Sequence, residues 1–209
     1  MGRLKSKKHD AAYWESLYRQ GMPPWDTGRP SPELMRLVSE QTIRPCSTLE
    51  IGCGTGANAI YLSQNRFDVT AVDASPLALE RARLRCEQEG GLVRFVLADI
   101  YDFAKNGGRF DLVLDAGFYH FARRTRLARF LDMLWWVTRP GSYYLALAGA
   151  TEEPAVEGGP PQVSEKQIRA ELGRLFEFVH LHSTRLESPL RPDGFPGWSC
   201  LMRRPVIAL

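Results

Sequence analysis

The segment LEIGCGTGANAI, residues 49–60, constrains the fold of this chain more than any other part of the sequence. An apolar strand leads into a turn that contains Gly52, Gly54 and Gly56, and a helix follows directly. Glycines in such a turn let the backbone approach a ligand closely, and the helix N-terminus offers free N–H groups to an electron-rich ligand. The segment therefore predicts a strand–turn–helix unit that holds a nucleotide-like cofactor.

Short apolar runs alternate with amphipathic segments after this unit. Four more apolar runs follow in the order DVTAVD, VRFVLAD, FDLVLDAG and YYLALAGA. The segments between them have helical spacing, the last from about residue 126 to residue 137, which indicates a parallel sheet covered on both faces. Two later runs, FEFVHLHS and GWSCLMRR, have no helix between them and predict an antiparallel hairpin at the sheet edge. We therefore expect a doubly wound α/β fold with seven strands.

A helical module with a proline-rich loop precedes the first strand. One helix is predicted to begin at Asp10 and a second at Pro32. The loop between them, MPPWDTGRPSPEL, holds Trp25 among four prolines. Such a loop loses little entropy on ordering, so a large aromatic side chain there covers either the protein's own core or a ligand. We expect one domain, with residues 1–45 as an N-terminal helical lid module and residues 46–209 as the α/β core.

Composition argues against several classes of protein. The net charge of +3 is too small to require a nucleic acid or a membrane as partner. The four cysteines lie far apart without a CxxC pair, which argues against a zinc site or a disulfide framework and is typical of the cytoplasm. The sequence also shows no apolar run near the ~20 residues of a membrane span, and its basic start, MGRLKSKKH, lacks the apolar stretch of a secretory signal. We expect a cytoplasmic monomer or homodimer with a disordered basic tail and no metal site.

Acidic residues at strand ends leave two cofactors open. The glycine pattern, closed by Ala57, satisfies the dinucleotide fingerprint, and Asp73 ends the next strand at the offset where NAD enzymes bind a ribose. Spacing alone therefore does not separate an NAD-dependent oxidoreductase from a methyltransferase. Glu50 ahead of the turn, Asp99 at the end of the third strand and the aromatic module before the first strand favour the methyltransferase. Both aspartates could instead cap the helices that follow them.

With these features the chain resembles the class I S-adenosylmethionine-dependent methyltransferases over nearly its whole length. The resemblance implies a Rossmann-like sheet of seven strands, S-adenosyl-L-methionine as cofactor and S-adenosyl-L-homocysteine as product. It also implies that the acid and glycines of the turn hold the methionine and ribose, that Asp73 holds the ribose hydroxyls, and that Asp99 with Ile100 meets the adenine. Cys53 is expected to be a small buried filler in the turn rather than a nucleophile. The cofactor-binding residues expected on this basis are Trp14, Tyr18, Trp25, Arg29, Glu50, Gly52, Cys53, Gly54, Gly56, Asn58, Asp73, Ala74, Asp99, Ile100 and Asp115.

A narrower resemblance concerns the segments before and after the core strands. The run YWESLYRQGMPPWDTGRPSPEL is similar to the N-terminal module of the thiol and halide methyltransferases, whose wider group includes thiopurine, tellurite-resistance and heterocyclic-toxin methyltransferases. The segments GPPQVSEKQIRAEL and GWSCLMRRP are similar to the C-terminal half of its bacterial members. The resemblance implies that Trp25 covers the sulfonium of the cofactor, where an indole face contributes roughly 0.5–2 kcal/mol. Asp26 and Arg29 would then fix the lid.

The segment LDAGFYHFARR, at the end of the fourth strand, is expected to line the acceptor side. Ala116 stands where thiopurine methyltransferases have an arginine for their substrate, which weakens the thiopurine interpretation. A compact pocket of Phe118, Tyr119 and His120 favours a small soft nucleophile, most of all a thiol or sulfide, or else a halide. Such acceptors need no strong base, and His120 or Tyr119 is the candidate to take a proton, with an ordinary hydrogen-bonded His120 as the alternative. The substrate-binding residues expected are Trp14, Ala116, Phe118, Tyr119, His120 and Trp198.

Other acceptors stay open at this point. A heterocyclic or phenolic small molecule, methylated on oxygen or nitrogen, is the main alternative. A nucleic-acid methyltransferase is suggested by Arg123, Arg124, Arg126 and Arg129. A charged helix face is usually solvated, however, and no Pro-Pro-Tyr-like amine-binding motif follows the fourth strand. We therefore expect a small-molecule methyl acceptor as the partner and no nucleic acid.

Overall fold

The computed structural model describes residues 10–151 and 159–206 of the chain. The helices are α1 (Ala11–Arg19), α2 (Pro32–Ser39), α3 (Ala57–Gln64), α4 (Pro76–Glu89), α5 (Ile100–Phe103), α6 (Tyr119–Val137) and α7 (Glu165–Leu172). The strands are β1 (Ser47–Ile51), β2 (Asp68–Asp73), β3 (Val93–Leu97), β4 (Phe110–Ala116), β5 (Thr138–Ala150), β6 (Gln162–Val163), β7 (Glu177–Ser188) and β8 (Arg191–Arg203). The tail predicted for residues 1–9 lies outside the described residues.

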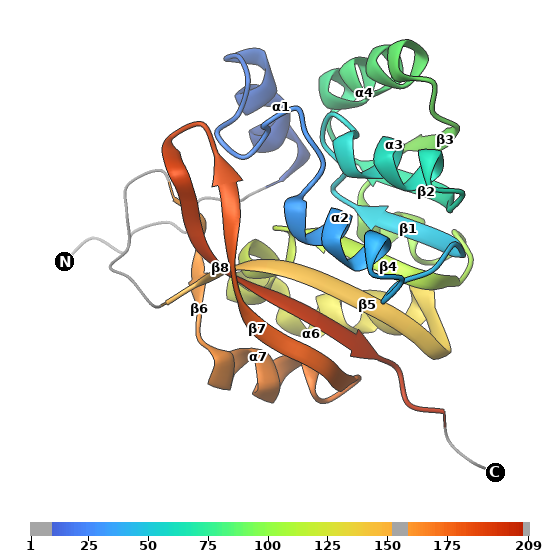
Figure 1. The fold of residues 1–209 in the computed structure, drawn as a ribbon, viewed down its shortest axis with the longest axis vertical. Helices are drawn as coiled ribbons and strands as arrows, with labels where there is room; N and C mark the ends of the chain where they lie inside the picture. The colour runs from blue at the N-terminus through green and yellow to red at the C-terminus, as the bar shows by residue number, and fades with distance from the viewer. Residues whose placement is uncertain (1–9, 152–158, 207–209) are drawn as a thin grey trace.

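A single sheet runs through the molecule in the order β3-β2-β1-β4-β5-β8-β7 (Figure 1). The strands from β3 to β5 in this order are parallel, and β8 is antiparallel to both β5 and β7. The predicted doubly wound sheet and its C-terminal hairpin are confirmed. The short β6 is an addition that the sequence did not indicate, and it pairs with β5 beside this path. The hairpin places β8 inside the sheet and leaves β7 as the edge strand.

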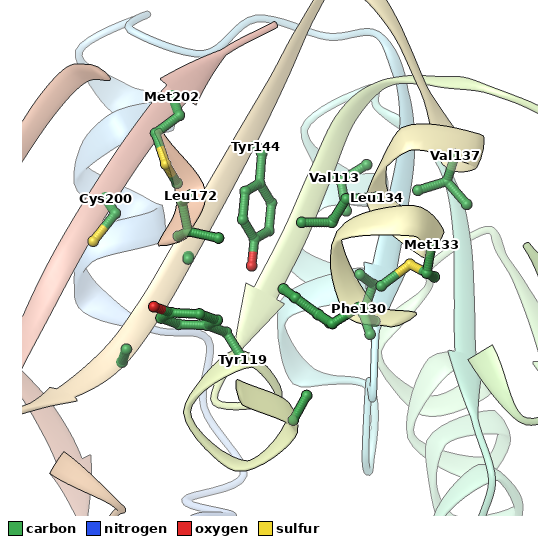
Figure 2. Packing of buried hydrophobic residues seen from close by; sticks show 14 of the residues in the cluster. Val113, Tyr119, Phe130, Met133, Leu134, Val137, Tyr144, Leu172, Cys200 and Met202 are labelled. Atoms are coloured by element: carbon green, nitrogen blue, oxygen red, sulfur yellow. The ribbon is translucent and has the colours of Figure 1, made fainter. Parts of the chain in front are cut away.

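Helices cover both faces of the sheet, and each face has its own hydrophobic cluster. Alternate residues of β5 show the division, because Tyr144 and Ala146 belong to one cluster and Leu145 and Leu147 to the other. The first cluster, part of which is drawn in Figure 2, also takes residues from α5, α6 and α7. The second takes residues from α2, α3 and α4. Burial on both sides explains why the strands are almost continuously apolar.

Capping residues set several helix ends as the sequence predicts. Asp10 accepts the N–H of Tyr13 at the start of α1, and Ser164 forms a reciprocal capping box with Gln167 at the start of α7. Ser31 precedes α2, but its hydroxyl makes no capping bond, and the proline that follows is what fixes the first turn. Within the described ranges, no helix is long and apolar enough to cross a membrane.

Helix α6 differs from the prediction, because it begins at Tyr119 and not near Arg126. Asp115, in β4, accepts the backbone N–H of Phe118 at 2.7 Å and that of Tyr119 at 3.0 Å, which satisfies two N–H groups of the first turn. Arg126 has non-helical angles, with φ −142° and ψ 27°, so the helix is kinked there. The kink explains why the regular apolar spacing starts only at this point of the sequence.

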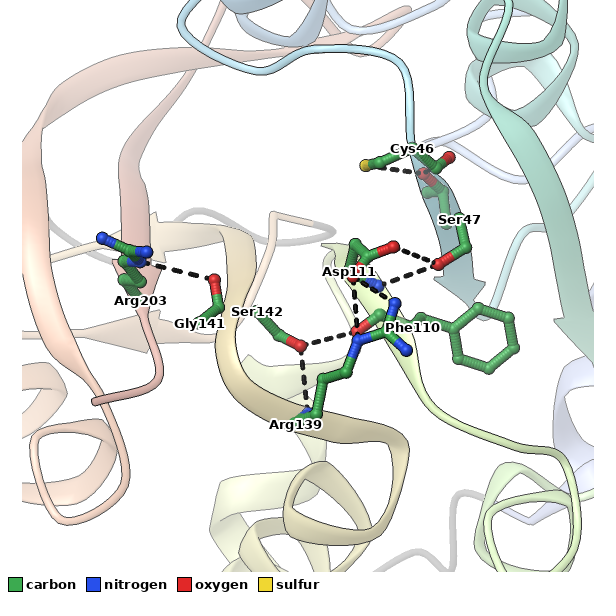
Figure 3. Close-up of polar contacts among 9 residues, drawn as sticks. Cys46, Ser47, Phe110, Asp111, Arg139, Gly141, Ser142 and Arg203 are labelled. Carbon is green, nitrogen blue, oxygen red and sulfur yellow. Dashed lines mark hydrogen bonds and ion pairs between the residues drawn. The ribbon is translucent and has the colours of Figure 1, made fainter. Parts of the chain in front are cut away.

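A polar network joins the amino ends of the central strands (Figure 3). Ser47 of β1 donates its hydroxyl to Oδ2 of Asp111 in β4 at 2.7 Å, and Arg139 of β5 pairs with the same carboxylate. Hydrogen bonds from Arg139 and Ser47 hold the pKa of Asp111 below its usual range. Ser142 closes the network by donating to the carbonyl of Phe110 at 2.7 Å. This end of the sheet is therefore occupied by its own contacts, and the carboxyl ends of the strands remain for a ligand.

The lid module contacts the core on one side and the hairpin on the other. Glu15 of α1 accepts from the hydroxyl of Ser75 at 2.7 Å and from the N–H of Leu77 at 3.2 Å, at the start of α4. The loop between α1 and α2, residues 20–31, is called the lid loop here. The tip of the β7–β8 hairpin reaches this loop, where Ser188 donates to the carbonyl of Pro24 at 2.7 Å. Figure 1 shows this tip rising beside α1.

Candidate active site

A cavity of about 1020 Å³ lies where the parallel strands end. Its wall contains residues that follow β1, β2, β3 and β4, and it is covered by α1 and the lid loop. Pro160, Pro161 and Phe195 complete the wall on the side of β5 and the hairpin, and the sequence analysis did not anticipate them. Ligand pockets run from ~300 to ~1,000 Å³, so this cavity is large enough for a cofactor together with a second molecule.

The glycine turn forms one wall of the cavity. Gly52, Gly54 and Gly56 all have positive φ, at 64°, 54° and 81°, which L side chains rarely adopt. Gly52 borders the cavity directly. The other two shape the turn behind it, since Gly54 donates its N–H to Oδ2 of Asp73 at 2.8 Å and Gly56 is the N-cap of α3. Cys53 is buried behind the wall, where burial raises its pKa well above the usual range, so it is a filler as expected.

Two of the predicted acids border the cavity and also cap backbone. Asp73 accepts the N–H of Gly54 and, through Oδ1, the N–H of Ser75 at 2.8 Å, while burial raises its pKa. Asp99 accepts the N–H of Tyr101 at 2.8 Å and begins α5. Both residues therefore cap backbone N–H groups and also line the cavity.

Glu50 is a buried acidic residue with one carboxyl oxygen that lacks a hydrogen-bond partner among the described residues. It is 2% exposed, and its Oε1 accepts from the amide of Asn58 at 3.1 Å. Its Oε2 is buried with no hydrogen-bond partner in the described part of the chain. Desolvation raises the pKa of Glu50 to about 8. A buried carboxyl group with one oxygen unpaired suits a ligand that brings a cation, and the ammonium group of S-adenosylmethionine is such a cation.

The lid loop presents aromatic side chains to the cavity. Trp14 meets Trp25 edge-on at 5.5 Å between ring centroids and Phe121 of α6 at 5.0 Å. Trp25 is 43% exposed and donates its indole N–H to the hydroxyl of the buried Tyr18. All four side chains line the cavity. The aromatic residues predicted at the cofactor therefore line the cavity, and they are joined there by Phe121, which was not predicted; their contact with the cofactor stays a prediction.

Asp26 and Arg29 attach the lid loop at two places. Asp26 accepts the hydroxyl of Thr55 in the glycine turn at 2.7 Å. Arg29 lies at the cavity rim, where it forms an exposed ion pair with Glu187 of the hairpin at 3.3 Å. Asn58 adds a third attachment, because its side-chain oxygen accepts the N–H of Ser31 at 2.8 Å.

On the acceptor side, Ala116, Phe118 and His120 border the cavity as predicted. His120 is 4% exposed, and its Nδ1 accepts the N–H of Gly149 at 3.1 Å. Burial lowers the pKa of His120 to about 3, so the ring is neutral. Because Nδ1 accepts, the proton of the neutral ring is assigned to Nε2. His120 therefore presents a hydrogen-bond donor, which agrees with the hydrogen-bonded alternative, and its role as a base stays a prediction.

Four other predicted site residues do not border the cavity, namely Glu50, Tyr119, Trp198 and Asp115. Tyr119 is buried in the core (Figure 2). Its hydroxyl donates to Glu171 at 2.7 Å. Trp198 donates its indole N–H to the carbonyl of Val163 at 2.8 Å. Asp115 is buried beneath α6, where it also accepts the hydroxyl of Tyr144 at 3.0 Å and burial raises its pKa to about 6. Tyr119, Trp198 and Asp115 therefore make structural contacts inside the protein, and the cofactor, substrate and catalytic roles predicted for them stay predictions.

The basic residues of α6 are partly engaged inside the molecule. Arg123 pairs with Glu171, and Arg129 lies over the ring of Tyr101 at 4.3 Å. Arg126 lies over the same ring at 6.0 Å, and Arg123, Arg124 and Arg126 border the cavity. Most of this basic helix face is therefore engaged with the protein's own side chains or with the cavity wall.

One cluster with metal-ligand chemistry occurs among the described residues, although the sequence analysis predicted none. Glu33, His180 and His182 bring ligand atoms within 4.8 Å of one another. None of the three borders the cavity. The signal in the sequence was the alternation of the two histidines along one strand.

Comparisons with known proteins agree with this geometry. A methyltransferase-domain family model matches residues 48–141. A 2-heptyl-1-hydroxyquinolin-4(1H)-one methyltransferase of Mycobacteroides abscessus is 28% identical over 192 residues, covering 87% of this chain and 83% of its own length. A solved structure from work on the conversion of a disulfide bond into a thioacetal group during echinomycin biosynthesis superposes with a TM-score of 0.82 at 25% identity, covering 95% of this chain and 94% of its own.

A further solved structure is similar in fold and contains the product of the cofactor. It is a Burkholderia thailandensis 1,6-didemethyltoxoflavin-N1-methyltransferase with bound S-adenosylhomocysteine, with a TM-score of 0.71, 22% identity and coverage of 99% of this chain and 94% of its own. The methyltransferase-domain match and the methyltransferase relative decide between the two cofactors that the glycine spacing left open. Together with the sheet order, the glycine turn and the unpaired buried acid, they indicate an S-adenosylmethionine-dependent methyltransferase with the class I fold.

Proposed function

We propose that the chain transfers the methyl group of S-adenosylmethionine to a planar aromatic or heterocyclic small molecule that arrives already ionised at oxygen, nitrogen or sulfur. The observation that carries this proposal is the state of His120. Its Nδ1 is taken by the N–H of Gly149, and its pKa is lowered to about 3. An N–H donor at Nε2 can bind an anion but cannot take a proton from a neutral acceptor. The nucleophilic form must therefore come from the acceptor's own acidity.

The walls of the cavity suit a flat ring. Trp14, Phe118 and Phe121 border the acceptor side, and Trp25 covers it from the lid. Aromatic pairs in edge or offset contact contribute about 0.5–1.5 kcal/mol beyond the area they bury. The Mycobacteroides relative is named for a hydroxylated quinolone, which is a planar ring system. This likeness supports a ring-shaped acceptor.

The reaction has a simple charge balance. The cofactor supplies a methyl group on a positively charged sulfur, and the acceptor anion displaces it in line. Both charges disappear in the step, so removal of water by Trp25 and the other lid residues favours the transition state over the separated ions. His120 orients the anion by its Nε2–H, and positioning supplies much of the remaining acceleration. Arg124 at the cavity rim attracts an anion from solution.

A small thiol or sulfide is the second candidate, with a halide beside it. A thiol with a pKa near ~8.5 is a few per cent ionised at neutral pH and needs no protein base. The likeness to the structure from the thioacetal work supports sulfur as an acceptor atom. A molecule of this size would leave the aromatic walls without contacts, so we expect a lower kcat/KM for methanethiol than for an aromatic thiol.

The test uses aromatic acceptors that differ in acidity, with small acceptors beside them. We would measure kcat/KM against pH for a thiophenol, a more acidic nitro-substituted thiophenol and a 1-hydroxyquinolone, with headspace detection for sulfide, methanethiol and iodide. The proposal expects the rate to inflect at each acceptor's own pKa. An inflection at one fixed pH for all acceptors would refute it, because that pattern reports a titrating group of the protein.

Two variants at one position complete the test. His120→Asn keeps a donor, and we expect it to retain activity within about tenfold. His120→Phe fills the space without a donor, and a loss of roughly 10- to 100-fold in kcat/KM is expected with little change in cofactor affinity. Equal loss in both variants, together with a flattened pH profile, would return His120 to the role of a base.

A further inference from the structure

We propose that Glu33, His180 and His182 form a binding site for a divalent transition-metal ion, with zinc as the reference ion, on the side of the sheet that α2 covers. Glu33 lies in the first turn of α2, and the two histidines lie in β7. The site is separate from the cofactor cavity, because none of the three residues borders it. It goes beyond the proposed function, since methyl transfer needs no ion there.

The distances match those of a tetrahedral ion. Oε1 of Glu33 and Nε2 of His182 lie 3.2 Å apart. Zinc binds imidazole nitrogen at about 2.0–2.1 Å and carboxylate oxygen at about 2.0–2.2 Å, which puts adjacent tetrahedral ligands about 3.3–3.5 Å apart. His180 completes the set, with all three ligand atoms within 4.8 Å of one another and the two rings 4.7 Å apart between centroids.

The sheet places the ligands without strain. Residues two apart in a strand point to the same face, so His180 and His182 both face α2. Ser199 is paired with His182 in the neighbouring strand β8, and its hydroxyl donates to Oε1 of Glu33 at 2.7 Å. The same hydroxyl lies 3.2 Å from Nε2 of His180. Ser199 therefore spans the space between the ligands and becomes an outer-shell partner when an ion is bound.

The charges around the site allow a metal ion to bind with moderate affinity. Burial and the neighbouring His182 lower the pKa of His180. Burial opposes ionisation of Glu33, but hydrogen bonds from Arg36 and Ser199 outweigh it and lower its pKa. Arg36 donates to Oε2 at 3.0 Å and to Oε1 at 2.9 Å, and it also pairs with Glu40. Its positive charge weakens binding, so we expect micromolar and not nanomolar affinity.

Access and ligand type indicate the class of ion. The side chain of His182 is 42% exposed and that of Glu33 is 7% exposed, so an ion can enter from solvent and keep water as a further ligand. Two imidazoles and one carboxylate select zinc, copper, nickel or iron over magnesium and calcium. A bound ion would join α2 of the lid module to the edge strand of the hairpin. It would stabilise the folded chain by mass action.

The experiment titrates zinc into the full chain after chelation of adventitious metal. We expect calorimetry to give one ion per chain and thermal unfolding to shift upward. Cobalt, titrated in parallel, should give visible absorption bands of a low-coordinate site that zinc abolishes. His180→Asn and His182→Asn should each weaken binding by more than the ~10–100-fold that an outer-shell partner costs. The control is Glu177→Gln, an exposed acid on the same strand, which should bind as the native chain does.

Two results would overturn the proposal. One is the absence of both zinc heat and a cobalt spectrum in the native chain. The other is evidence that the ion binds elsewhere, which would be either unchanged binding in both histidine variants or a sulfur-to-cobalt charge-transfer band. S-adenosylhomocysteine affinity and far-ultraviolet circular dichroism check that the variants fold. If they do not, the cobalt spectrum of the native chain, which reports nitrogen and oxygen or sulfur ligands directly, decides the question.

Discussion

Cofactor binding should expel a proton from Glu50. Its Oε2 is buried with no partner in the described ranges, and desolvation raises its pKa to about 8. At pH 6.5 a carboxyl group with this pKa is roughly 97% protonated in the free chain, whereas the α-ammonium of the cofactor, with a pKa of about 7.7–8.0, is almost fully charged. Contact with that ammonium favours the ionised carboxylate, so the proton leaves as the cofactor binds.

The magnitude follows from the two pKa values. We expect about 0.9 proton released per cofactor at pH 6.5, and a dissociation constant that falls about tenfold per pH unit between pH 5 and pH 7. The stability of the free chain has the opposite dependence. A carboxyl pKa raised by folding, here from 4.5 to about 8, makes the free chain lose stability as the pH rises through that window. Glu50→Gln should remove both dependences.

The assay is calorimetric titration with S-adenosylhomocysteine at pH 6.5 in two buffers of different ionisation enthalpy. Glu50→Gln should show no difference between the buffers, while Glu187→Gln, an exposed acid at the cavity rim, should keep the native proton release. Equal heats in both buffers for the native chain, with a dissociation constant that is flat from pH 5.5 to pH 7.5, would refute the reasoning. Glu50 would then be ionised before the cofactor arrives, or would not meet its ammonium.

Two further substitutions test the walls of the cavity. Gly54→Ala places a Cβ at φ 54° and 2.7 Å from the hydroxyl of Tyr18, so we expect it to lower both thermal stability and cofactor affinity. Gly90→Ala is the control, because Gly90 has φ 76° and open space around it. It isolates the roughly 1–2 kcal/mol of left-handed strain and should leave cofactor affinity intact. If both glycine variants lowered affinity equally, the contact with Tyr18 would not be the cause. Trp25→Ala should weaken S-adenosylhomocysteine binding by about tenfold while the unfolding midpoint hardly moves, since the indole is 43% exposed. Unchanged affinity with a large loss of stability would make Trp25 a core residue.

The sequence could predict which candidate site residues lie near strand ends. Glu50, Asp73 and Asp99 each lie at or next to the end of an apolar run, and a parallel sheet brings the carboxyl ends of neighbouring strands to one edge. The glycine turn was equally accessible, because its residues need backbone angles that other residues avoid. These features depend on local sequence and on one rule of sheet topology.

The directions of side chains in α6 and β8 could not be predicted from the sequence in the same way. The start of α6 at Tyr119 is set by Asp115, and a shift of one residue in the helix decides that Tyr119 turns to the core while His120 and Phe121 reach the cavity. Trp198 lies in a strand buried on both faces, so no polar alternation shows which way it points. The protonation of His120 depends on the backbone of Gly149, a contact that only the folded chain defines.

The cluster of Glu33, His180 and His182 was missed for a related reason. His180 and His182 were interpreted as ordinary strand residues, because their partner Glu33 comes from a helix at the other end of the chain. Helical and strand periodicities assign a face within one element and say nothing about which element covers it. Long-range pairings of this kind have to be observed.

The contacts between the lid and the hairpin fix the order in which the chain can become functional. Ser188 meets Pro24 across 164 positions, and Ser199 meets Glu33 across 166 positions. A growing chain on the ribosome emerges amino end first, and its early segments can fold while later ones are still being made. The glycine turn is then exposed long before β8 arrives to support the lid. Retention of cofactor therefore waits for the last strand of the sheet, and a chain truncated before it would keep the nucleotide motif yet lack a closed site.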